Sequence, residues 1–279
     1  MTPMPLPSEC SKSSIILSSV ALACLPVVVQ AQAQSSLRDQ EIAQCLPNEV
    51  ATWGDGQDRP VAAGALLLAY RHDDAPPWFS ATQVLAMVQH AAQAWSACGI
   101  GVQVQAVAPG ARVPPGAVLV QWSDGAAGGH FGLANLRTYS LALGPAAFRT
   151  LNQRNPAHPA ADTLQMVVSH EMGHFFGLMA HSRRCVDVMS YYDNGQGERC
   201  FTRAGAMPAT RGDYRALLPT ACDIARCRAV NAGVQAGQVD RQQQARQPGP
   251  HQLPAQQHAQ DDGGDGQALD PAVGLDQLR

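Results

Sequence analysis

The sequence predicts a sheet covered by two long helices, of the α/β or α+β class. Four short segments have the apolar or alternating pattern of strands, and two longer segments repeat apolar residues at three- and four-residue spacing, as amphipathic helices do. Their order along the chain is strand, helix, three strands, helix. That order is typical of helices packed against one sheet.

The four predicted strands follow one another in the first half of the chain. Residues 63–72 are mainly apolar and are expected to form a buried strand, whereas residues 100–107 alternate between apolar and polar. Residues 117–124 are apolar enough for a central strand, and residues 138–144 form a further short strand.

The predicted helices have recognisable ends. The first begins after Ser80, a residue type that caps helices, and stops at Gly99. The second carries His170 and is apolar on both sides of it. A shorter helix is predicted over residues 210–219, which begin with the spacing of a capping box.

Composition and charge exclude some classes of partner. The 279-residue chain is 46% hydrophobic and carries a net charge of −3, so it lacks the basic footprint of a protein that binds nucleic acid. We therefore expect no nucleic-acid partner. Beyond the N-terminal region, no segment reaches the roughly 18 apolar residues that a membrane-spanning helix needs.

The N-terminus predicts export. Lys12 precedes an apolar stretch at residues 14–29, and small residues ending at Ala33 supply a cleavage site, so residues 1–33 are predicted to be a signal peptide. A lipoprotein anchored at Cys24 is the less favoured alternative, because the residue three positions earlier is not the usual leucine. The mature protein is expected in the periplasm or outside the cell.

Three regions follow the signal peptide. Residues 34–58 are polar and irregular, residues 59–230 contain the predicted strands and helices, and residues 231–279 are rich in Gln, Gly, Pro and Asp. The last region has almost no large apolar residues, so it cannot bury enough surface to offset its loss of conformational entropy. We expect it to be a disordered tail.

Export places the cysteines in an oxidising compartment. Six remain after cleavage at Ala33, and this even number predicts up to three disulfides; they are Cys45, Cys98, Cys185, Cys200, Cys222 and Cys227. Their spacing alone does not choose among the many possible connectivities. A metal site built from these cysteines is not favoured, because the chain has no C-x-x-C pair.

The stretch SHEMGHFFGLMAHS, residues 169–182, holds the candidate chemistry. His170 and His174 are one helical turn apart on the same helix face, so both rings can bind one metal ion. Glu171 lies beside that face, where it can act as a general base. The apolar flanks bury this helix, and buried histidines without a metal or a cleft would be costly.

The third metal ligand is predicted to be His181. Gly177 can take the left-handed conformation that ends a helix, which places the following residues in a loop. In the pattern HExxHxxGxxH the last histidine would fall at Ala180, which cannot bind zinc, and His181 follows one residue later. A loop absorbs an extra residue as a bulge, whereas a helix would rotate every later side chain by about 100°.

These residues resemble the metzincin zinc endopeptidases, and among them the matrixins. Met189, in CVDVMSYY, is similar to the methionine of the family's Met-turn, which lies beneath the zinc site. In matrixins a serine follows the third ligand and the methionine lies eight residues after that ligand; Ser182 and Met189 have these spacings from His181. The resemblance covers roughly residues 66–219. The extra residue before His181 is one departure from the family.

The resemblance implies an α+β fold: a twisted, mostly parallel sheet with an antiparallel edge strand, two long helices, a Met-turn and a C-terminal helix. It also implies a secreted endopeptidase in which His170, His174 and His181 hold one zinc ion and Glu171 is the general base for a zinc-bound water. A protein or peptide substrate would align by strand addition along an edge strand, which we expect at residues 138–144.

Tyr191 is a second departure, because matrixins usually have proline there. The Met-Ser-Tyr turn is similar to that of serralysins and astacins, whose tyrosine reaches the zinc and stabilises the oxyanion. Tyr191 either has that role or packs beneath the specificity pocket. No structural zinc is expected, because the loop that binds it in vertebrate matrixins has no counterpart beyond His130.

The resemblance also bears on the cysteines. Cys185 and Cys200 bracket the Met-turn and the segment that walls the specificity pocket, so we expect them to bond to each other. The remaining pairs would then be Cys45–Cys98 and Cys222–Cys227. Matrixins are often silenced by a pro-segment cysteine, but Cys45 lacks the family's neighbouring residues, and a disulfide is the favoured alternative.

The main rival is a catalytically inactive, secreted binding module on the same scaffold. Inactive relatives usually lose the glutamate, whereas this chain keeps Glu171. The favoured prediction is therefore an active, monomeric zinc peptidase.

Overall fold

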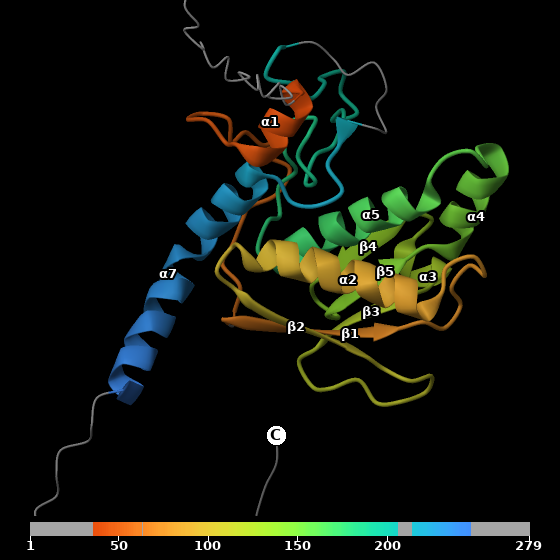
Figure 1. Cartoon of the computed structure of the whole chain (residues 1–279), viewed down its shortest axis with the longest axis horizontal. Coiled ribbons are helices and arrows are strands. Elements are labelled where there is room, and N and C mark those ends of the chain that lie inside the picture. Colours follow the sequence, from red (N-terminus) through yellow and green to blue (C-terminus); the bar gives the residue numbers. More distant parts are fainter. Residues whose placement is uncertain (1–35, 63, 206–213, 247–279) are drawn as a thin grey trace, which may run out of the picture.

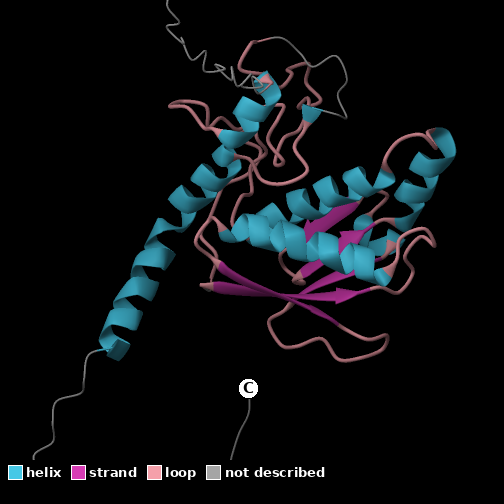
Figure 2. Ribbon diagram, viewed as in Figure 1, coloured by secondary structure: helices cyan, strands magenta, loops and turns pink. Residues whose placement is uncertain are grey.

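The computed structural model of the protein describes residues 36–62, 64–205 and 214–246. These residues form an α+β fold with one five-stranded sheet, in the order β2-β1-β3-β5-β4, and six helices. All neighbouring strands run parallel except β4 and β5, so the sheet is mostly parallel with one antiparallel edge strand. Figures 1 and 2 show the two longest helices of the main body on one face of the sheet.

The strands are β1 (Ala65–Arg71), β2 (Gly101–Ala106), β3 (Val118–Trp122), β4 (Gly132–Asn135) and β5 (Ser140–Leu143). The four predicted strands are confirmed as β1, β2, β3 and β5. However, the prediction that residues 138–144 form an edge strand is wrong, because β5 pairs with β3 on one side and β4 on the other. The edge is β4, whose four residues are too few to show a strand pattern in the sequence.

The long helices are α2 (Ala81–Ser96) and α5 (Ala160–Phe175). α2 begins as predicted, with the hydroxyl of Ser80 accepting the backbone N–H of Gln83 at 3.2 Å. The core lies between these helices and the sheet; its fully buried residues include Leu68, Val84, Val88, Trp95, Val120, Leu164, Val168 and Met172. The indole N–H of Trp95 donates to the carbonyl of Ser169 at 2.9 Å, which ties α2 to α5 beside His170.

Two further helices flank the sheet: α3 (Asp124–Ala127) and α4 (Pro145–Arg154). α4 was not predicted, although proline in the first helical turn is a known start signal. Of the helix predicted over residues 210–219, residues 210–213 lie outside the described residues and Tyr214 is helical, whereas residues 215–219 form bends and irregular structure, so the helix does not extend as far as predicted. There the N–H of Ala216 donates to the carbonyl of Val186, so this segment bonds to the loop before Met189 rather than to itself.

Residues 36–58 are not an irregular appendage, contrary to the prediction. They contain α1 (Leu37–Ala43), which begins with a capping box formed by Ser36 and Asp39. Glu41 of α1 is completely buried, where it accepts hydrogen bonds from Tyr214 and the backbone of Arg203. In Figure 1, α1 and the loops that follow α5 form a lobe above the sheet and its helices.

The C-terminal helix α7 (Ala221–Arg246) runs past the predicted end of the domain. The prediction of disorder from residue 231 is therefore wrong as far as Arg246. Asn231 is fully buried, and its side chain donates to the carbonyls of Phe176 and Cys227 and accepts the N–H of Val61. The Ala, Gln and Arg residues that follow favour a helix even without an apolar face. The rest of the predicted tail, residues 247–279, lies outside the described residues.

The described residues contain three disulfides: Cys45–Cys222, Cys98–Cys227 and Cys185–Cys200. The Cys185–Cys200 prediction is confirmed. The predicted pairs Cys45–Cys98 and Cys222–Cys227 are wrong. Cys222 and Cys227 are five residues apart on α7, so their side chains point about 140° apart around the helix and reach different partners. One meets the end of α1 and the other meets the end of α2.

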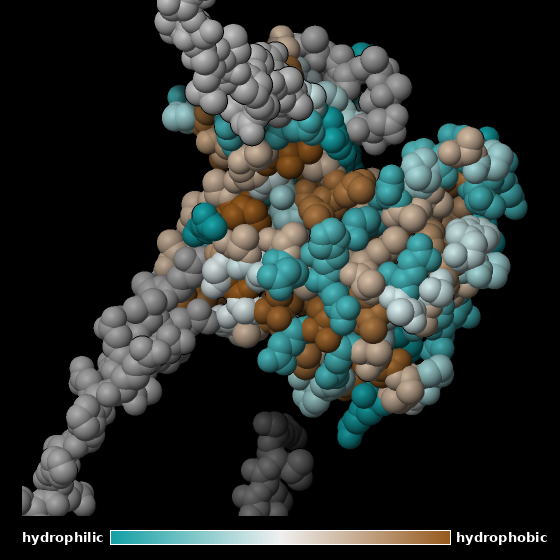
Figure 3. Space-filling model, viewed as in Figure 1, coloured by the Kyte–Doolittle hydropathy of each residue, from teal (hydrophilic) through white to brown (hydrophobic). Residues whose placement is uncertain are grey.

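Three disulfides indicate an oxidising compartment outside the cytoplasm. None of the helices in the described ranges is long and apolar enough to cross a membrane. The predicted signal peptide and Cys24 lie outside these ranges. On the face seen in Figure 3, hydrophilic and hydrophobic residues alternate over α2, and hydrophobic residues gather where the α1 lobe meets the main body.

Candidate metal centre

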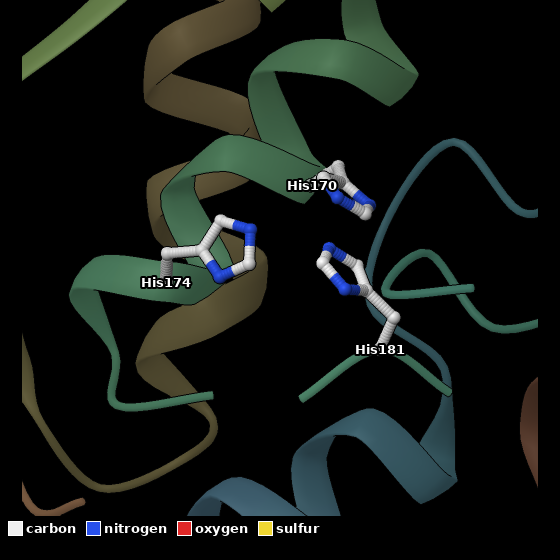
Figure 4. Close-up of side chains that lie close together, drawn as sticks. All are labelled: His170, His174 and His181. Carbon is white, nitrogen blue, oxygen red and sulfur yellow. The ribbon is translucent and has the colours of Figure 1, made fainter. Parts of the chain in front are cut away.

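Three histidines converge at the end of α5. His170 and His174 project from one face of the helix, and His181 faces them from the loop that follows (Figure 4). Their candidate ligand nitrogens all lie within 4.8 Å of one another. The centroids of the three rings form a nearly equilateral triangle, with sides of 5.3, 5.1 and 5.2 Å. The structure thus brings together all three residues that the sequence pointed to.

Gly177 turns the chain back toward the helix face. Its φ is +98°, the left-handed conformation that the sequence predicted. A Cβ at this position would lie 2.3 Å from the carbonyl oxygen of Arg59, so a side chain is excluded by space as well as by conformation. The N–H of Arg59 donates to the carbonyl of Gly177, which fixes the turn against the segment before β1.

The residue inserted before His181 is held by a second set of bonds. Oδ1 of Asp58 accepts the N–H of Met179 at 2.8 Å and the N–H of Ala180 at 3.1 Å. The guanidinium of Arg226, on α7, donates to Asp58 and to the carbonyl of Ala180. Both the N–H and the carbonyl of Ala180 are therefore hydrogen-bonded, and the loop held in this way directs His181 toward the other two histidines.

Each histidine has one ring nitrogen already engaged. The Nδ1–H groups donate to fixed oxygens, in the pairs His170 to Val188 at 2.7 Å, His174 to Leu178 at 2.7 Å and His181 to Asp55 at 2.6 Å. Carbonyl and carboxylate oxygens only accept hydrogen bonds, so Nδ1 carries the proton and Nε2 carries the lone pair in all three rings. Nε2 of His181 is buried and has no hydrogen-bond partner among the described residues. This is the tautomer that a metal ligand requires.

Burial also keeps these rings neutral. It lowers the pKa of His170 well below 6.5 and that of His174 to about 4, in both cases with help from the neighbouring histidines. Burial lowers the pKa of His181 as well, although Asp55 opposes the shift. Neutral imidazole is the form that binds a metal ion, so the three rings are ready to do so at neutral pH.

Glu171 lies beside the histidines against the edge strand β4. Burial raises the pKa of its carboxyl group to about 7, and Oε2 accepts the N–H of Ala134 at 2.8 Å. A Cβ on Gly132 would lie 2.8 Å from Cγ of Glu171, so the glycine in β4 makes room for the glutamate. A carboxylate with a pKa near neutrality can both take and release a proton.

Met189 packs against the helix that carries His170 and His174. It is fully buried, and its sulfur would be 2.3 Å from a Cβ at Gly173, which lies between His170 and His174 on α5. The carboxylate of Asp223, on α7, accepts the N–H of Val188, the residue whose carbonyl binds His170. α7 therefore positions the segment of Val188 and Met189, and this segment positions His170.

Tyr191 packs on the third histidine. Its ring is stacked on that of His181, with centroids 3.6 Å apart and planes inclined by 14°. The side chain is 43% exposed and faces the cleft, so it is not an aromatic residue packed beneath a pocket.

A cleft of about 380 Å³ opens onto this centre. Its walls are formed by β4, by α5 and by the loops after α5; the lining residues include Phe131, Leu133, Met166, Val167, Glu171, Tyr191 and Arg215. A second hollow of about 470 Å³ adjoins it and shares His174. The histidines therefore lie where an extended segment of polypeptide can reach them.

Several residues of this centre escaped the sequence analysis. Asp55, Asp58, Arg226 and Arg215 carry no motif, and Asp55 lies 126 residues from His181, so no local pattern connects them. His130 lines the cleft but joins no metal-ligand cluster among the described residues. Cys45, Glu49 and Cys222 also lie close together, but the two cysteines form a disulfide and cannot bind a metal there.

Comparisons with known proteins do not assign the chain to a family. No family model matches it, and no curated protein matches it. Among solved structures it is similar to the "GM1 bound form of the ECX AB5 holotoxin", with a TM-score of 0.37 and 15% sequence identity, over 67% of this chain and 91% of that chain. A similarity at this level supports no argument about function.

Proposed function

We propose that the protein is a secreted, zinc-dependent endopeptidase of the metzincin type. One observation carries the proposal: three neutral imidazoles converge through Nε2 atoms, each with Nδ1 held by a fixed acceptor, next to a buried glutamate. Secretion is supported by the disulfides and by the signal peptide that the sequence predicts.

The fold supports the metzincin assignment in its finer features. The mostly parallel sheet ends in the antiparallel edge strand β4, and two long helices, α2 and α5, cover it. A buried methionine, Met189, lies below the histidines, and the C-terminal helix α7 follows. These are the features that the resemblance implied.

The residues present fit a zinc ion. Three histidines that line the cleft would hold the ion, and three histidine nitrogens are a ligand set found in catalytic zinc sites. The oxygens that accept the Nδ1–H groups of the three rings, including the carboxylate of Asp55, are of the kind that orient metal-bound histidines. Bound zinc would supply the Lewis acid that polarises the scissile carbonyl and lowers the pKa of water in the cleft.

Glu171 acts as the general base. With a pKa of about 7 it takes a proton from the attacking water and then gives it to the leaving amine. The N–H of Ala134 holds Oε2, so the other carboxylate oxygen is left to face the reaction. Tyr191 is proposed to stabilise the oxyanion from its place above His181.

The edge strand β4 aligns the substrate. Its outer side has no neighbouring strand among the described residues, so its backbone can pair with an extended peptide. β4 also contacts Glu171, which places the paired peptide next to the general base. The substrate is therefore an unfolded or extended protein segment.

The test is cleavage of casein by the mature, zinc-loaded protein. Glu171→Gln should reduce the rate by at least about a hundredfold, because a general base contributes that much or more. Asp73→Asn, which alters an exposed carboxylate just after β1, is the control and should leave the rate unchanged. Stoichiometric zinc without any cleavage would instead support the inactive binding module.

A further inference from the structure

Arg215 supplies the cleft with a fixed positive charge. It lines the cleft together with His170, Tyr191 and Met166, and it is the only arginine or lysine among the described residues that do so. Its charge contributes to the lowered pKa values of His170 and His181, so it lies within electrostatic range of the metal centre. A ligand atom bound by Arg215 would therefore lie close to the reacting bond.

No carboxylate of the described residues is seen to form an ion pair with Arg215, and Asp223 attracts it only from a longer range. The Nε atom of Arg215 is buried without a hydrogen-bond acceptor, its Nη1 contacts the sulfur of Met166 at 3.3 Å, and its guanidinium lies 4.8 Å from the ring centroid of Tyr192. The two arginines that are buried, Arg184 and Arg226, by contrast form ion pairs with carboxylates. A cation withdrawn from water is costly without a partner, and Arg215 lines both this cleft and a smaller hollow of about 190 Å³ to which Asp162 also contributes.

The backbone around Arg215 is rigidly held. The guanidinium of Arg38, on α1, donates to the carbonyls of Tyr214 and Arg215 at 2.9 and 3.0 Å. The N–H of Arg215 donates to the hydroxyl of Tyr192 at 3.3 Å. Little conformational freedom is left to lose on binding, so the site is preorganised for a ligand.

We propose that Arg215 binds a carboxylate of the substrate and makes this centre selective for peptides with a carboxylate next to the scissile bond. The inference rests on the proposed peptidase function and names its substrate class. A guanidinium pairs with a carboxylate through two parallel N–H···O bonds, and the partly desolvated cleft strengthens them. The carboxylate comes either from an Asp or Glu side chain or from the C-terminus of a short peptide.

The test uses internally quenched peptides and the zinc-loaded, mature protein. A single Glu is moved through the two positions on each side of the scissile bond, and each peptide is compared with its Gln counterpart. We expect one position at which Glu raises kcat/KM by about tenfold or more, as a charged hydrogen bond to a desolvated site does. Peptides that end in a free carboxylate are also compared with peptides that end in an amide. A preference for the free carboxylate shows that Arg215 binds a C-terminus, and a preference for Glu shows that it binds a side chain.

Three variants assign the effect. Arg215→Gln should reduce the Glu-to-Gln ratio to about one while neutral peptides are still cleaved, and Arg215→Lys should restore part of the preference. Arg112→Gln, which removes an exposed arginine from the loop between β2 and β3, should keep the full ratio. The melting temperature of each variant shows whether it is folded.

Binding provides a readout that does not depend on catalysis. The same peptides, labelled with a fluorophore, are bound to the zinc-loaded Glu171→Gln variant, and fluorescence anisotropy measures their affinities. The peptide with Glu or with a free carboxylate should bind more tightly than its neutral counterpart. Adding Arg215→Gln to this variant should remove the difference. Cleavage without any carboxylate preference overturns the role of Arg215 and leaves the peptidase intact. Absence of cleavage, with carboxylate-selective binding that depends on Arg215, overturns the peptidase and supports the carboxylate site. Equal binding of all peptides overturns the site.

Discussion

Asp55 holds His181 by two hydrogen bonds at once. Oδ1 accepts the backbone N–H of His181 at 2.9 Å, and Oδ2 accepts the ring Nδ1–H at 2.6 Å. One carboxylate therefore fixes both the backbone position and the ring orientation of His181, which lies one residue later than the pattern HExxHxxGxxH gives. Asp55 belongs to the segment before β1, so the metal centre depends on residues outside the predicted catalytic region.

The first prediction concerns this carboxylate. Asp55→Ala should weaken zinc binding by about 10- to 100-fold, because the loss of an outer partner leaves the ligand ring free to turn. Competition with a chromophoric chelator measures the affinity. Asp73→Ala, which alters an exposed carboxylate at the end of β1, should bind zinc as the unaltered protein does. Equal affinities for the two variants would show that Asp55 does not orient the ligand.

The second prediction concerns Glu171 and pH. The pKa of its carboxyl group is raised by burial from 4.5 to about 7, so the stability contributed by this group is fully present below pH 4.5 and is lost as pH rises through 7. In metal-free protein, Glu171→Gln should therefore be more stable than the unaltered protein by about 2 kcal/mol at pH 8 and nearly equal to it at pH 4.5. Urea unfolding at the two pH values measures this. A difference that does not change with pH would contradict the prediction.

The third prediction compares two glycines with positive φ. Gly177 has a φ of +98° and would place a Cβ 2.3 Å from the carbonyl oxygen of Arg59, whereas Gly110 has a φ of +70° and open space around it. Gly110→Ala should cost about 1 kcal/mol from conformation alone. Gly177→Ala should cost clearly more and should also weaken zinc binding, because the turn directs His181. Similar losses of stability in thermal unfolding, with zinc affinity unchanged, would count against this role.

The fourth prediction concerns the disulfide Cys45–Cys222, which ties the end of α1 to the start of α7. Replacing both cysteines by alanine should destabilise the protein by roughly 3 kcal/mol, because the bond closes a long loop in the unfolded chain. Calorimetry measures the loss. Peptide mapping without reduction should recover Cys45 with Cys222, and recovery of Cys45 with Cys98 would refute the structure here.

Much of this architecture is local enough to be predicted from the sequence. Ser80 and Gly99 mark the ends of α2, and apolar or alternating runs mark β1, β2, β3 and β5. Gly177 ends the helix as expected, which is why His181 could be assigned despite the unusual spacing. In each case the signal lies within a few residues of the feature that it predicts.

The features that were missed depend on distant partners. β4 is recognisable as a strand only because β5 pairs with it, and the order of the sheet decides which strand is the edge. The Cys45–Cys222 pairing requires α1 to dock on α7, contacts that join residues 177 apart. Arg215 lies in the predicted helix but directly after its last helical residue, Tyr214, because its carbonyl binds Arg38 and the N–H of Ala216 binds Val186. Local sequence patterns do not show which distant segments of the chain pack against one another.

The central claim is that His170, His174 and His181 bind one zinc ion together, and zinc content tests it most directly. The purified mature protein, its His181→Ala variant and a His90→Ala control on the exposed side of α2 would be dialysed against the same limiting zinc and analysed for metal per chain. We predict one zinc per chain in the unaltered protein and in His90→Ala, and a near-complete loss in His181→Ala with its fold retained. Zinc bound equally well by His181→Ala, or no zinc in the unaltered protein, would contradict the account.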